Sequence, residues 1–227
     1  MGLRVTVIEN APGAPVGSFG DYLVAEHGAA LRVIPGPGLP DPAALAEADL
    51  HVVLGSPHSA YDELPWIAAE RRLLAELIAA DRPVIGICFG AQMIAAAIGG
   101  TVQPTGTFHG GWTEVASLGD PVWQGPWVRW HGDHFQLPPA AEVLATADGT
   151  IQAFGYRRAV GVQFHPEATE AILRGWAGRA DPRRALGPEG TAAMLEAAAA
   201  GLQGAAARRK ALFDAMLRRC LAPVPAG

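Results

Sequence analysis

The sequence predicts an α/β protein built on an open, mostly parallel sheet with helices on both faces. Up to residue 87, short apolar runs rich in β-branched residues alternate with helical patterns, which is typical of βαβ units. After Gly99 and Gly100 the runs shorten and few helical periods separate them, which predicts antiparallel additions to the sheet. A chain of 227 residues suits one domain, expected over residues 1–227, with a helical C-terminal tail from about residue 186.

The first half of the chain supplies the strands and helices of the parallel part. Four predicted strands cover residues 3–8, 30–34, 50–54 and 84–87. Three helices are expected between them, at residues 19–27, 42–48 and 65–80. The second of these opens with Asp41 as N-cap and Pro42 at its first position. Residues 9–20 and 35–42 are rich in Pro and Gly and should form loops at the carboxyl edge of the sheet.

The second half of the chain predicts short strands followed by helices. The strands are expected at residues 101–103, 112–116, 127–130, 143–146, 151–154 and 160–164. These pieces should continue the sheet as antiparallel hairpins. Helical patterns return at residues 170–176 and 189–220, and Gly201 and Gly204 are candidate breaks in the longer one.

Composition and charge narrow the classes of function. The net charge is −5, so nothing resembles the basic footprint of a nucleic-acid-binding protein, and the Arg clusters of the C-terminal tail fit a solvated helix face. No apolar run is long enough to span a bilayer and no signal-peptide pattern opens the chain, so no membrane contact is expected. The two cysteines, Cys88 and Cys220, make a disulfide scaffold unexpected and fit a reducing, cytoplasmic location.

The residues around Cys88 combine a strand, a tight turn and a helix. An apolar run ends in Gly-x-Cys-x-Gly at residues 86–90, and a helical pattern follows at once. This is the arrangement of a nucleophile elbow with Cys in place of Ser, in which the two glycines leave room for a sharp fold. The turn should project Cys88 from the carboxyl end of the strand, at the positive end of a helix dipole that favours thiolate. A buried cysteine between apolar residues also fits a core hydrophobe, so the motif alone leaves both interpretations open.

A second strand pattern ends in His165, Pro166 and Glu167. Two residues apart in extended chain, His165 and Glu167 point to the same side, and Pro166 favours extended geometry for the residue before it. A histidine at the end of one strand and a cysteine at the end of another can meet above a sheet, with the carboxylate orienting the imidazole. The two motifs together therefore favour a catalytic Cys88.

The two motifs and one turn resemble those of the class I, or triad, glutamine amidotransferases. The resemblance rests on residues 86–92 (GICFGAQ), 165–167 (HPE) and 55–57 (GSP), and runs from about residue 3 to the helix after Glu167. Residues 130–133 (WHGD) look most like free-standing members similar to the amidotransferase part of GMP synthase. The resemblance implies a flavodoxin-like fold, no cofactor, and a glutamine side chain attacked at its amide carbon. It implies Cys88 as nucleophile, His165 as base and Glu167 as its orienter.

The attacked amide becomes an oxyanion, which needs hydrogen-bond donors already in place. The N–H of Phe89, the residue after the nucleophile, is one expected donor. The resemblance points to Gly55 and Ser56 for the second, but the family carries two adjacent glycines before Pro where this chain has Ser56. If that position needs φ above zero, Ser56 would be strained by about 1–3 kcal/mol. An ordinary strand-end turn is the alternative interpretation of residues 55–57.

Three further polar residues are substrate-binding candidates. Gln92 lies one helical turn beyond Cys88, and the resemblance has it contact the bound glutamine, although its spacing equally fits a bond to a neighbouring loop. The resemblance places His131 and Asp133 in a loop near the backbone end of the glutamine, with a purely hydrogen-bonded loop as the alternative. His131 and His134 have a zinc-like spacing, but nothing completes a ligand set, so no metal site is predicted.

Three functions fit these residues. The first is a glutaminase that passes ammonia to a synthetase, expected as a separate chain because no P-loop occurs in the sequence. The second is a stand-alone hydrolase of γ-glutamyl compounds such as glutathione-like conjugates or γ-glutamyl amines. The third is a non-enzymatic module, against which the intact Cys88, His165 and Glu167 argue. In the first two, glutamine or a γ-glutamyl small molecule acylates Cys88, and water then opens the thioester.

Overall fold

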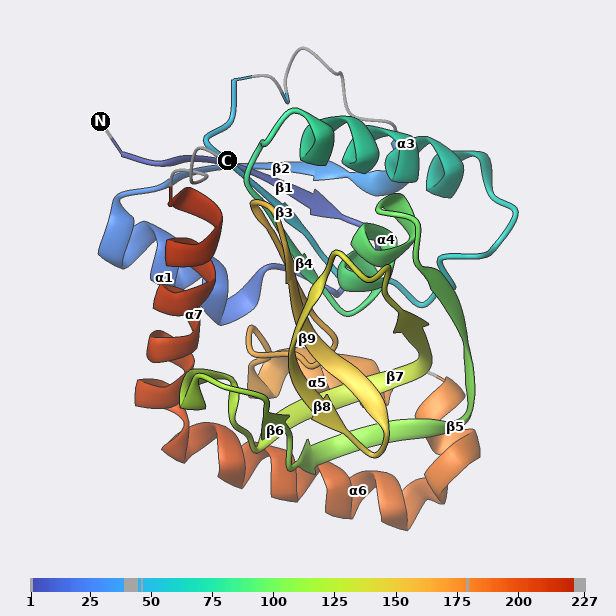
Figure 1. Ribbon diagram of the computed structural model, residues 1–227. Coiled ribbons are helices and arrows are strands. Elements are labelled where there is room, and N and C mark those ends of the chain that lie inside the picture. The colour runs from blue at the N-terminus through green and yellow to red at the C-terminus, as the bar shows by residue number, and fades with distance from the viewer. Residues whose placement is uncertain (1, 39–44, 46, 179, 223–227) are drawn as a thin grey trace.

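The centre of the computed structural model is a twisted sheet, which in residues 2–38, 45, 47–178 and 180–222, the part that the structure describes, has eight strands (Figure 1). The strand order is β2-β1-β3-β4-β10-β9-β8-β6. The parallel strands are β2 (Ala30–Pro35), β1 (Arg4–Glu9), β3 (Leu50–Val53), β4 (Val84–Ile87) and β10 (Ala159–Val162). The antiparallel extension consists of β9 (Thr150–Tyr156), β8 (Glu142–Ala147) and β6 (Ala116–Ser117). The predicted α/β class is confirmed.

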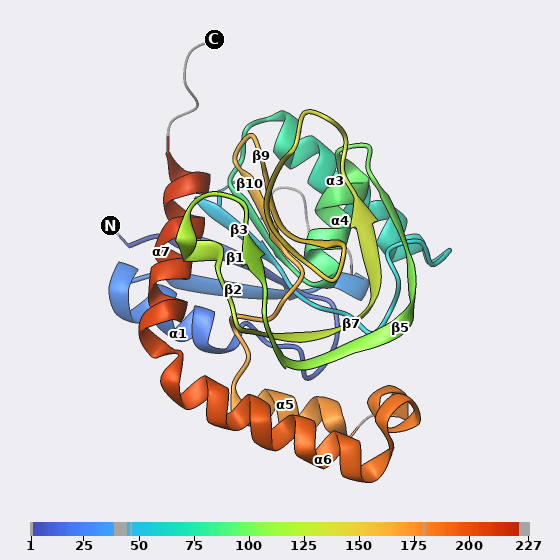
Figure 2. The ribbon, with the colours of Figure 1, turned by 60° about the horizontal axis from the view of Figure 1, so that its bottom comes forward.

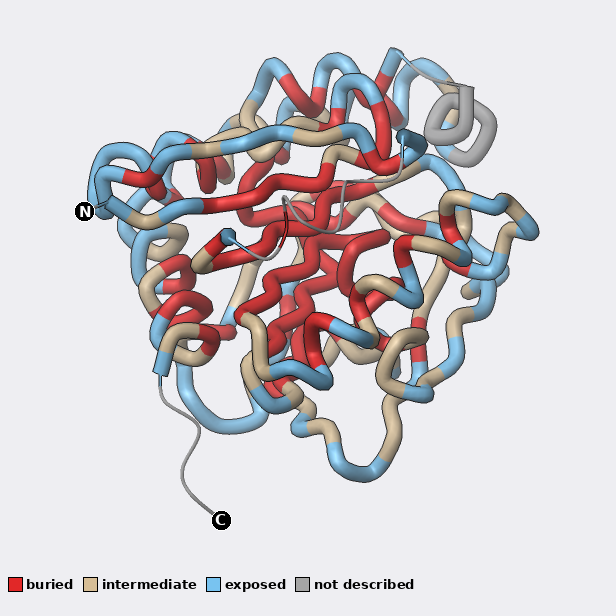
Figure 3. The backbone as a smooth tube through the Cα atoms, turned by 90° about the horizontal axis from the view of Figure 1, so that it is seen from above, coloured by how far each residue is buried: buried red, intermediate tan, exposed pale blue. Residues whose placement is uncertain are grey.

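Helices cover both faces of this sheet because the strands are apolar on both faces. Helices α1 (Gly17–His27) and α7 (Ala206–Leu221) pack on one face, and α3 (Pro65–Ala79) and α4 (Phe89–Ala97) on the other (Figure 2). Along β1, Val5 and Val7 join the core under α1 and α7, whereas Ile8 joins the core under α3 and α4. Buried residues accordingly follow the central strands, with exposed residues around them (Figure 3).

Two long strands form a second sheet, which the sequence did not predict. Strands β5 (Thr101–Thr113) and β7 (Trp127–Gln136) pair antiparallel with each other and, among the described residues, with no strand of the main sheet. The predictions of strands at 101–103 and 127–130 were therefore too short, and the expectation that these strands continue the main sheet was wrong. Helices α5 (Glu170–Ala177) and α6 (Ala180–Gly204) cover this second sheet through Ile172, Leu173, Ala198 and Leu202.

Of the two glycines predicted as candidate breaks in the C-terminal helix, one ends a helix and the other does not. Helix α6 ends at Gly204, one of the two predicted candidates, whereas Gly201 lies inside it. Gly201 packs against the Trp112 ring, which an added Cβ would approach to 2.3 Å. The Arg cluster of α7 is not simply a solvated face, since the Arg208 guanidinium lies 5.4 Å and 5.3 Å from the ring centroids of Trp112 and Trp127.

Short 3-10 turns complete the described chain, at η1 (Gly36–Gly38) and η2 (Pro121–Trp123). Most of the helix expected at 42–48, with its cap, lies outside the described residues. Among the described residues, no helix combines the length and the apolar character needed to cross a bilayer.

Candidate active site

Cys88 occupies a tight turn between β4 and α4. Its backbone has φ 54° and ψ −109°, outside the regions that L residues favour, and such a conformation costs of order 1–3 kcal/mol. The turn depends on its two glycines. A Cβ on Gly86 would lie 2.5 Å from the carbonyl carbon of Gly90, and a Cβ on Gly90 would lie 2.1 Å from the Val53 carbonyl oxygen. This is the geometry of a nucleophile elbow.

The thiol of Cys88 lies among polar groups although only 6% of the residue is exposed. Its Sγ is 3.8 Å from the carbonyl oxygen of Trp130, and the side-chain amide of Gln163 donates to Sγ at 3.5 Å. The Nε2 of Gln92 in turn donates to Oε1 of Gln163 at 3.2 Å. Gln92 thus holds the amide that contacts the sulfur.

His165 and Glu167 form a buried pair just beyond the end of β10. The Nδ1 of His165 lies 2.7 Å from Oε1 of Glu167, and each residue is 3% exposed. Burial opposes the charged imidazole, but the Glu167 carboxylate and Cys88 outweigh it and raise the pKa of His165 to about 10. Among the described residues, Nε2 of His165 has no hydrogen-bond partner, so this nitrogen remains available to a reacting group.

The turn after β3 lies directly against both residues. A Cβ built on Gly55 would lie 3.6 Å from Cε1 of His165 and 4.0 Å from Cβ of Cys88. Ser56 does not have a positive φ, so the strain considered for it from the sequence does not arise. Its Oγ accepts a hydrogen bond from the N–H of His58 at 3.2 Å.

A buried amide and a buried carboxyl group lie behind this turn. The Nδ2 of Asn10 donates to the Leu54 carbonyl at 3.2 Å and to Oε1 of Glu70 at 3.1 Å. Burial raises the pKa of Glu70 to about 7, although the bond from Asn10 acts in the opposite direction. The Leu54 carbonyl and the Gly55 N–H belong to one planar trans peptide, so Asn10 fixes the direction of both.

Cys88, His165 and Gly55 line a cavity of about 320 Å³. Its polar lining includes Ser56, His58, Ser59, Gln92 and Asp133. Its aromatic lining consists of Phe108, Trp130 and Trp176. A concave site with a few convergent polar groups on an apolar wall is the usual form of a small-molecule site.

Comparison with known proteins agrees with this geometry. The sequence model described as "Glutamine amidotransferase class-I" matches residues 23–172, more than half of the chain. The chain belongs to this family.

Relatives of this chain include GMP synthases and proteins of its own length. It is 34% identical over 154 residues to "GMP synthase [glutamine-hydrolyzing]" of Corynebacterium glutamicum, covering 63% of this chain and only 28% of that longer protein. A glutamine amidotransferase from Thermotoga maritima shares the flavodoxin-like α/β fold with a TM-score of 0.83, at 26% identity over 98% of this chain and 100% of that one. A glutamine amidotransferase from Methylobacillus flagellatus has the same fold, with a TM-score of 0.83 at 23% identity over 96% of each chain.

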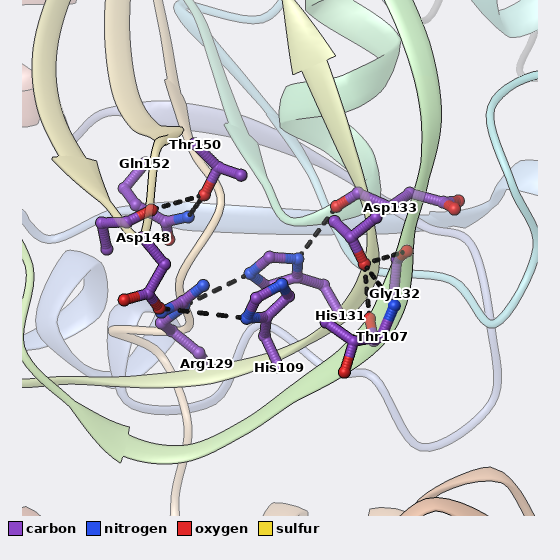
Figure 4. Close-up of polar contacts among 11 residues, drawn as sticks. Thr107, His109, Arg129, His131, Gly132, Asp133, Asp148, Thr150 and Gln152 are labelled. Carbon is purple, nitrogen blue, oxygen red and sulfur yellow. Dashed lines mark hydrogen bonds and ion pairs between the residues drawn. The ribbon is translucent and has the colours of Figure 1, made fainter.

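Polar contacts occupy both ring nitrogens of His131 (Figure 4). Nδ1 lies 2.9 Å from the backbone carbonyl of Asp133, and Nε of Arg129 lies 3.5 Å from Nε2. Burial, and next the Arg129 charge, lower the pKa of His131 to about 3, so the ring is neutral and donates from Nδ1. Arg129 is itself buried and pairs with Asp148 at 2.5 Å. A contact from residue 131 to a substrate would therefore come from its backbone and not from its ring.

The Asp133 carboxylate is held at the cavity by two hydroxyl groups. Ser59 donates to Oδ2 at 2.6 Å and Tyr61 donates to Oδ1 at 3.1 Å. Neither donor was predicted from the sequence, nor were Asn10, Glu70, Phe108 and Trp176. None of these six residues lies in a recognisable motif. The sequence feature that could have indicated some of them is their position near a motif: Ser59 and Tyr61 follow the turn at 55–57, and Trp176 lies in the helix after Glu167.

Proposed function

We propose that this chain hydrolyses a γ-glutamyl amide through a thioester on Cys88, releasing glutamate and either ammonia or an amine. The observation that carries the proposal is that a strained Cys88, Gly55 and His165 line one cavity, with Glu167 bonded to His165. Membership in the class I glutamine amidotransferases supports a γ-carboxamide as the group attacked. Non-enzymatic retention of the fold would not require the strain at Cys88.

In the first step, the Cys88 thiolate attacks the γ-carbonyl carbon. The N–H of Phe89 is at the first position of α4, where helix N–H groups lack an intrahelical acceptor, and in this proposal it donates to the developing oxyanion. The turn at Gly55 and Ser56 supplies the second donor. The carbon–nitrogen bond then breaks, and protonated His165 gives its Nε2 proton to the departing nitrogen, as Glu167 keeps the ring oriented.

In the second step, water opens the γ-glutamyl thioester. His165, now neutral, takes a proton from the water as it attacks the thioester carbon, and the carbon–sulfur bond breaks to leave the Cys88 thiolate and glutamate. At the other end of the substrate, the Asp133 carboxylate offers a partner for the α-ammonium group, because its two oxygens are already fixed by Ser59 and Tyr61.

Two uses of this chemistry have separate support. Similarity to GMP synthase favours a glutaminase that passes ammonia to a synthetase on a separate chain. A pocket that is already formed among the described residues favours a chain that acts alone. Neither use requires a nucleic acid or a membrane as partner.

The deciding experiment follows ammonia or amine and glutamate released by the purified chain alone, on glutamine and on γ-glutamyl amides. We expect turnover by the natural sequence and none by Cys88→Ala, which removes only the sulfur from the buried turn. A glutamine-analogue electrophile should modify Cys88 by mass spectrometry, and glutamine should slow the modification. Turnover by Cys88→Ala would place the nucleophile elsewhere. Labelling that begins only after a second protein is added would favour the synthetase-dependent use.

A further inference from the structure

The cavity in front of Cys88 has an aromatic wall that hydrolysis of glutamine itself does not use. Phe108 comes from β5, Trp130 from β7 and Trp176 from α5. The ring centroids of Phe108 and Trp130 are 5.4 Å apart at 87°, and those of Trp130 and Trp176 are 5.7 Å apart at 46°. The three rings therefore form one continuous surface. Phe108 and Trp130 are only half-buried, so part of this apolar surface faces the cavity.

The aromatic wall begins at the catalytic base. The Trp176 ring centroid lies 4.5 Å from that of His165, at a tilt of 59°. Nε2 of His165 is buried and has no partner among the described residues. A nitrogen that leaves with the Nε2 proton must come within hydrogen-bond distance of this atom. A substituent on that nitrogen consequently extends from His165 into the space bounded by the three rings.

The position of the wall is fixed before a substrate binds. The indole N–H of Trp176 donates to the Gly13 carbonyl at 2.9 Å, and Ala14 of the same loop also lines the cavity. Trp176 is 6% exposed, so its indole is held on several sides. A preformed apolar surface binds an apolar group without an ordering cost, whereas ammonia is small and polar and gains nothing from it.

The polar half of the cavity complements this wall. Asp133 and the serines at positions 56 and 59 offer hydrogen bonds to the amino-acid end of a γ-glutamyl group. Cys88 and Gly55 lie with His165 where the scissile amide must sit. The cavity lining is thus complementary to a molecule with a polar glutamyl end and an apolar amine end.

We propose that Phe108, Trp130 and Trp176 bind the substituent of the departing amine, and that the preferred substrates are γ-glutamyl amides of arylalkyl amines. This inference rests on the proposed function and names its substrate class. Atoms balance as for glutamine: the amide carbon–nitrogen bond breaks, the amine leaves with the proton from His165, and water supplies the oxygen of the glutamate carboxylate.

The test compares kcat/KM of the full chain for γ-glutamylbenzylamide, γ-glutamylmethylamide and glutamine, followed by glutamate release. We expect kcat/KM for the benzylamide to exceed that for glutamine by about tenfold or more, with the methylamide between them. Phe108→Ala should lower the benzylamide-to-glutamine ratio by about tenfold, and Phe108→Leu should restore part of it. Leu118→Ala, at a residue 58% exposed and outside the cavity, should leave the ratio unchanged.

Each outcome distinguishes this inference from the function on which it rests. Hydrolysis of glutamine with no preference for the benzylamide would overturn the inference and leave the proposed function intact. An equal loss of kcat/KM on all three substrates in Phe108→Ala would show that the ring has a structural role, and this result would also overturn the inference. Failure of the natural chain to hydrolyse any of the three would overturn this inference, and labelling of Cys88 by the glutamine-analogue electrophile, with or without a second protein, would then decide whether the proposed function stands.

Discussion

Cys88 and His165 are each held by their surroundings in a state that the isolated residue disfavours. Cys88 keeps a positive φ of 54° because β4 and α4 pack closely through Gly86 and Gly90. His165 is buried, yet its pKa is raised to about 10 because Glu167 and Cys88 outweigh the desolvation of its ring. Strained backbone and shifted protonation at one point are typical of functional sites.

The proposed roles predict a graded response to substitution. His165→Ala should lower the single-turnover rate by roughly 10⁴-fold or more, because neither a base nor an acid remains. Glu167→Gln should cost less than His165→Ala, because it keeps the shape of the side chain and leaves the imidazole in place as base and acid. Thermal unfolding of both variants serves as the control for folding. Equal losses at the two positions, or no loss at His165, would contradict the assigned roles.

At the residue scale, the site residues that could be predicted from the sequence are those that lie in short local motifs. Cys88, His165 and Glu167 lie in two short motifs whose turn chemistry is readable. The structure brings Cys88 and His165 to one cavity with Gly55, Ser56, Gln92 and Asp133, and Glu167 contacts His165 from behind it. The aromatic wall was not predictable, because Phe108 and Trp176 belong to β5 and α5 and meet only in the folded chain. The enclosure of the His131 ring was not predictable either. It depends on Arg129, which lies on the same strand, and on Asp148, which pairs with Arg129 from a distant turn.

Among the elements, helix α3 is linked to the active-site turn through a buried carboxyl group. Glu70 is fully buried on α3, and Asn10 connects it to the carbonyl of Leu54, one residue before Gly55. Burial raises the pKa of Glu70 from 4.5 to about 7, so the folded protein keeps a proton there that the unfolded chain releases. By linkage, this group makes the folded state less stable as pH rises from 4.5 to 7, and the loss is complete above 7.

We therefore expect Glu70→Gln to stabilise the protein in alkaline solution. The amide keeps an acceptor for Asn10 and carries no charge, so the gain at pH 8 should approach about 3 kcal/mol and vanish near pH 4.5. Urea unfolding at the two pH values measures it. Glu76→Gln, at an exposed position of the same helix, is the matched control and should change little at either pH. The same gain at both pH values would show that the Glu70 proton is not involved.

The predicted boundaries of the elements agree best with the structure where helices and strands alternate. Strands β1, β3 and β4 agree with their predicted spans to within one residue at each end, because each is a buried apolar run between turn residues. Strands β5 and β7 were predicted too short, because Pro104, Gly106, Gly110 and Gly111 dilute the β pattern of β5 and only the partner strand supplies the pairing.

In the molecule as a whole, helices α1 and α7, from opposite halves of the described chain, both contact the segment that carries Glu167. Ser18 on α1 donates its N–H to the Glu167 carbonyl at 2.9 Å, and Arg209 on α7 donates to the Ala168 carbonyl at 3.1 Å. Helix α7 contributes Leu212, Phe213 and Met216 to the same core cluster as β1 and β4. The helical tail expected from the sequence is thus part of the core and supports the segment that carries Glu167.

The packing of α7 predicts the effect of opening this core. Phe213 is 2% exposed, and its ring centroid lies 4.7 Å from that of Phe19 and 5.2 Å from that of Tyr22, both on α1. Phe213→Ala should lower the free energy of unfolding by about 3–5 kcal/mol, because it removes buried apolar surface and leaves a cavity between two helices. Lys210→Ala removes exposed ion pairs to Glu26 on α1 and to Asp214 on α7, and a contact of the ammonium group with the Tyr22 ring at 5.3 Å, and should cost much less. Denaturant unfolding at neutral pH measures both variants, and equal small losses would show that α7 is a peripheral helix after all.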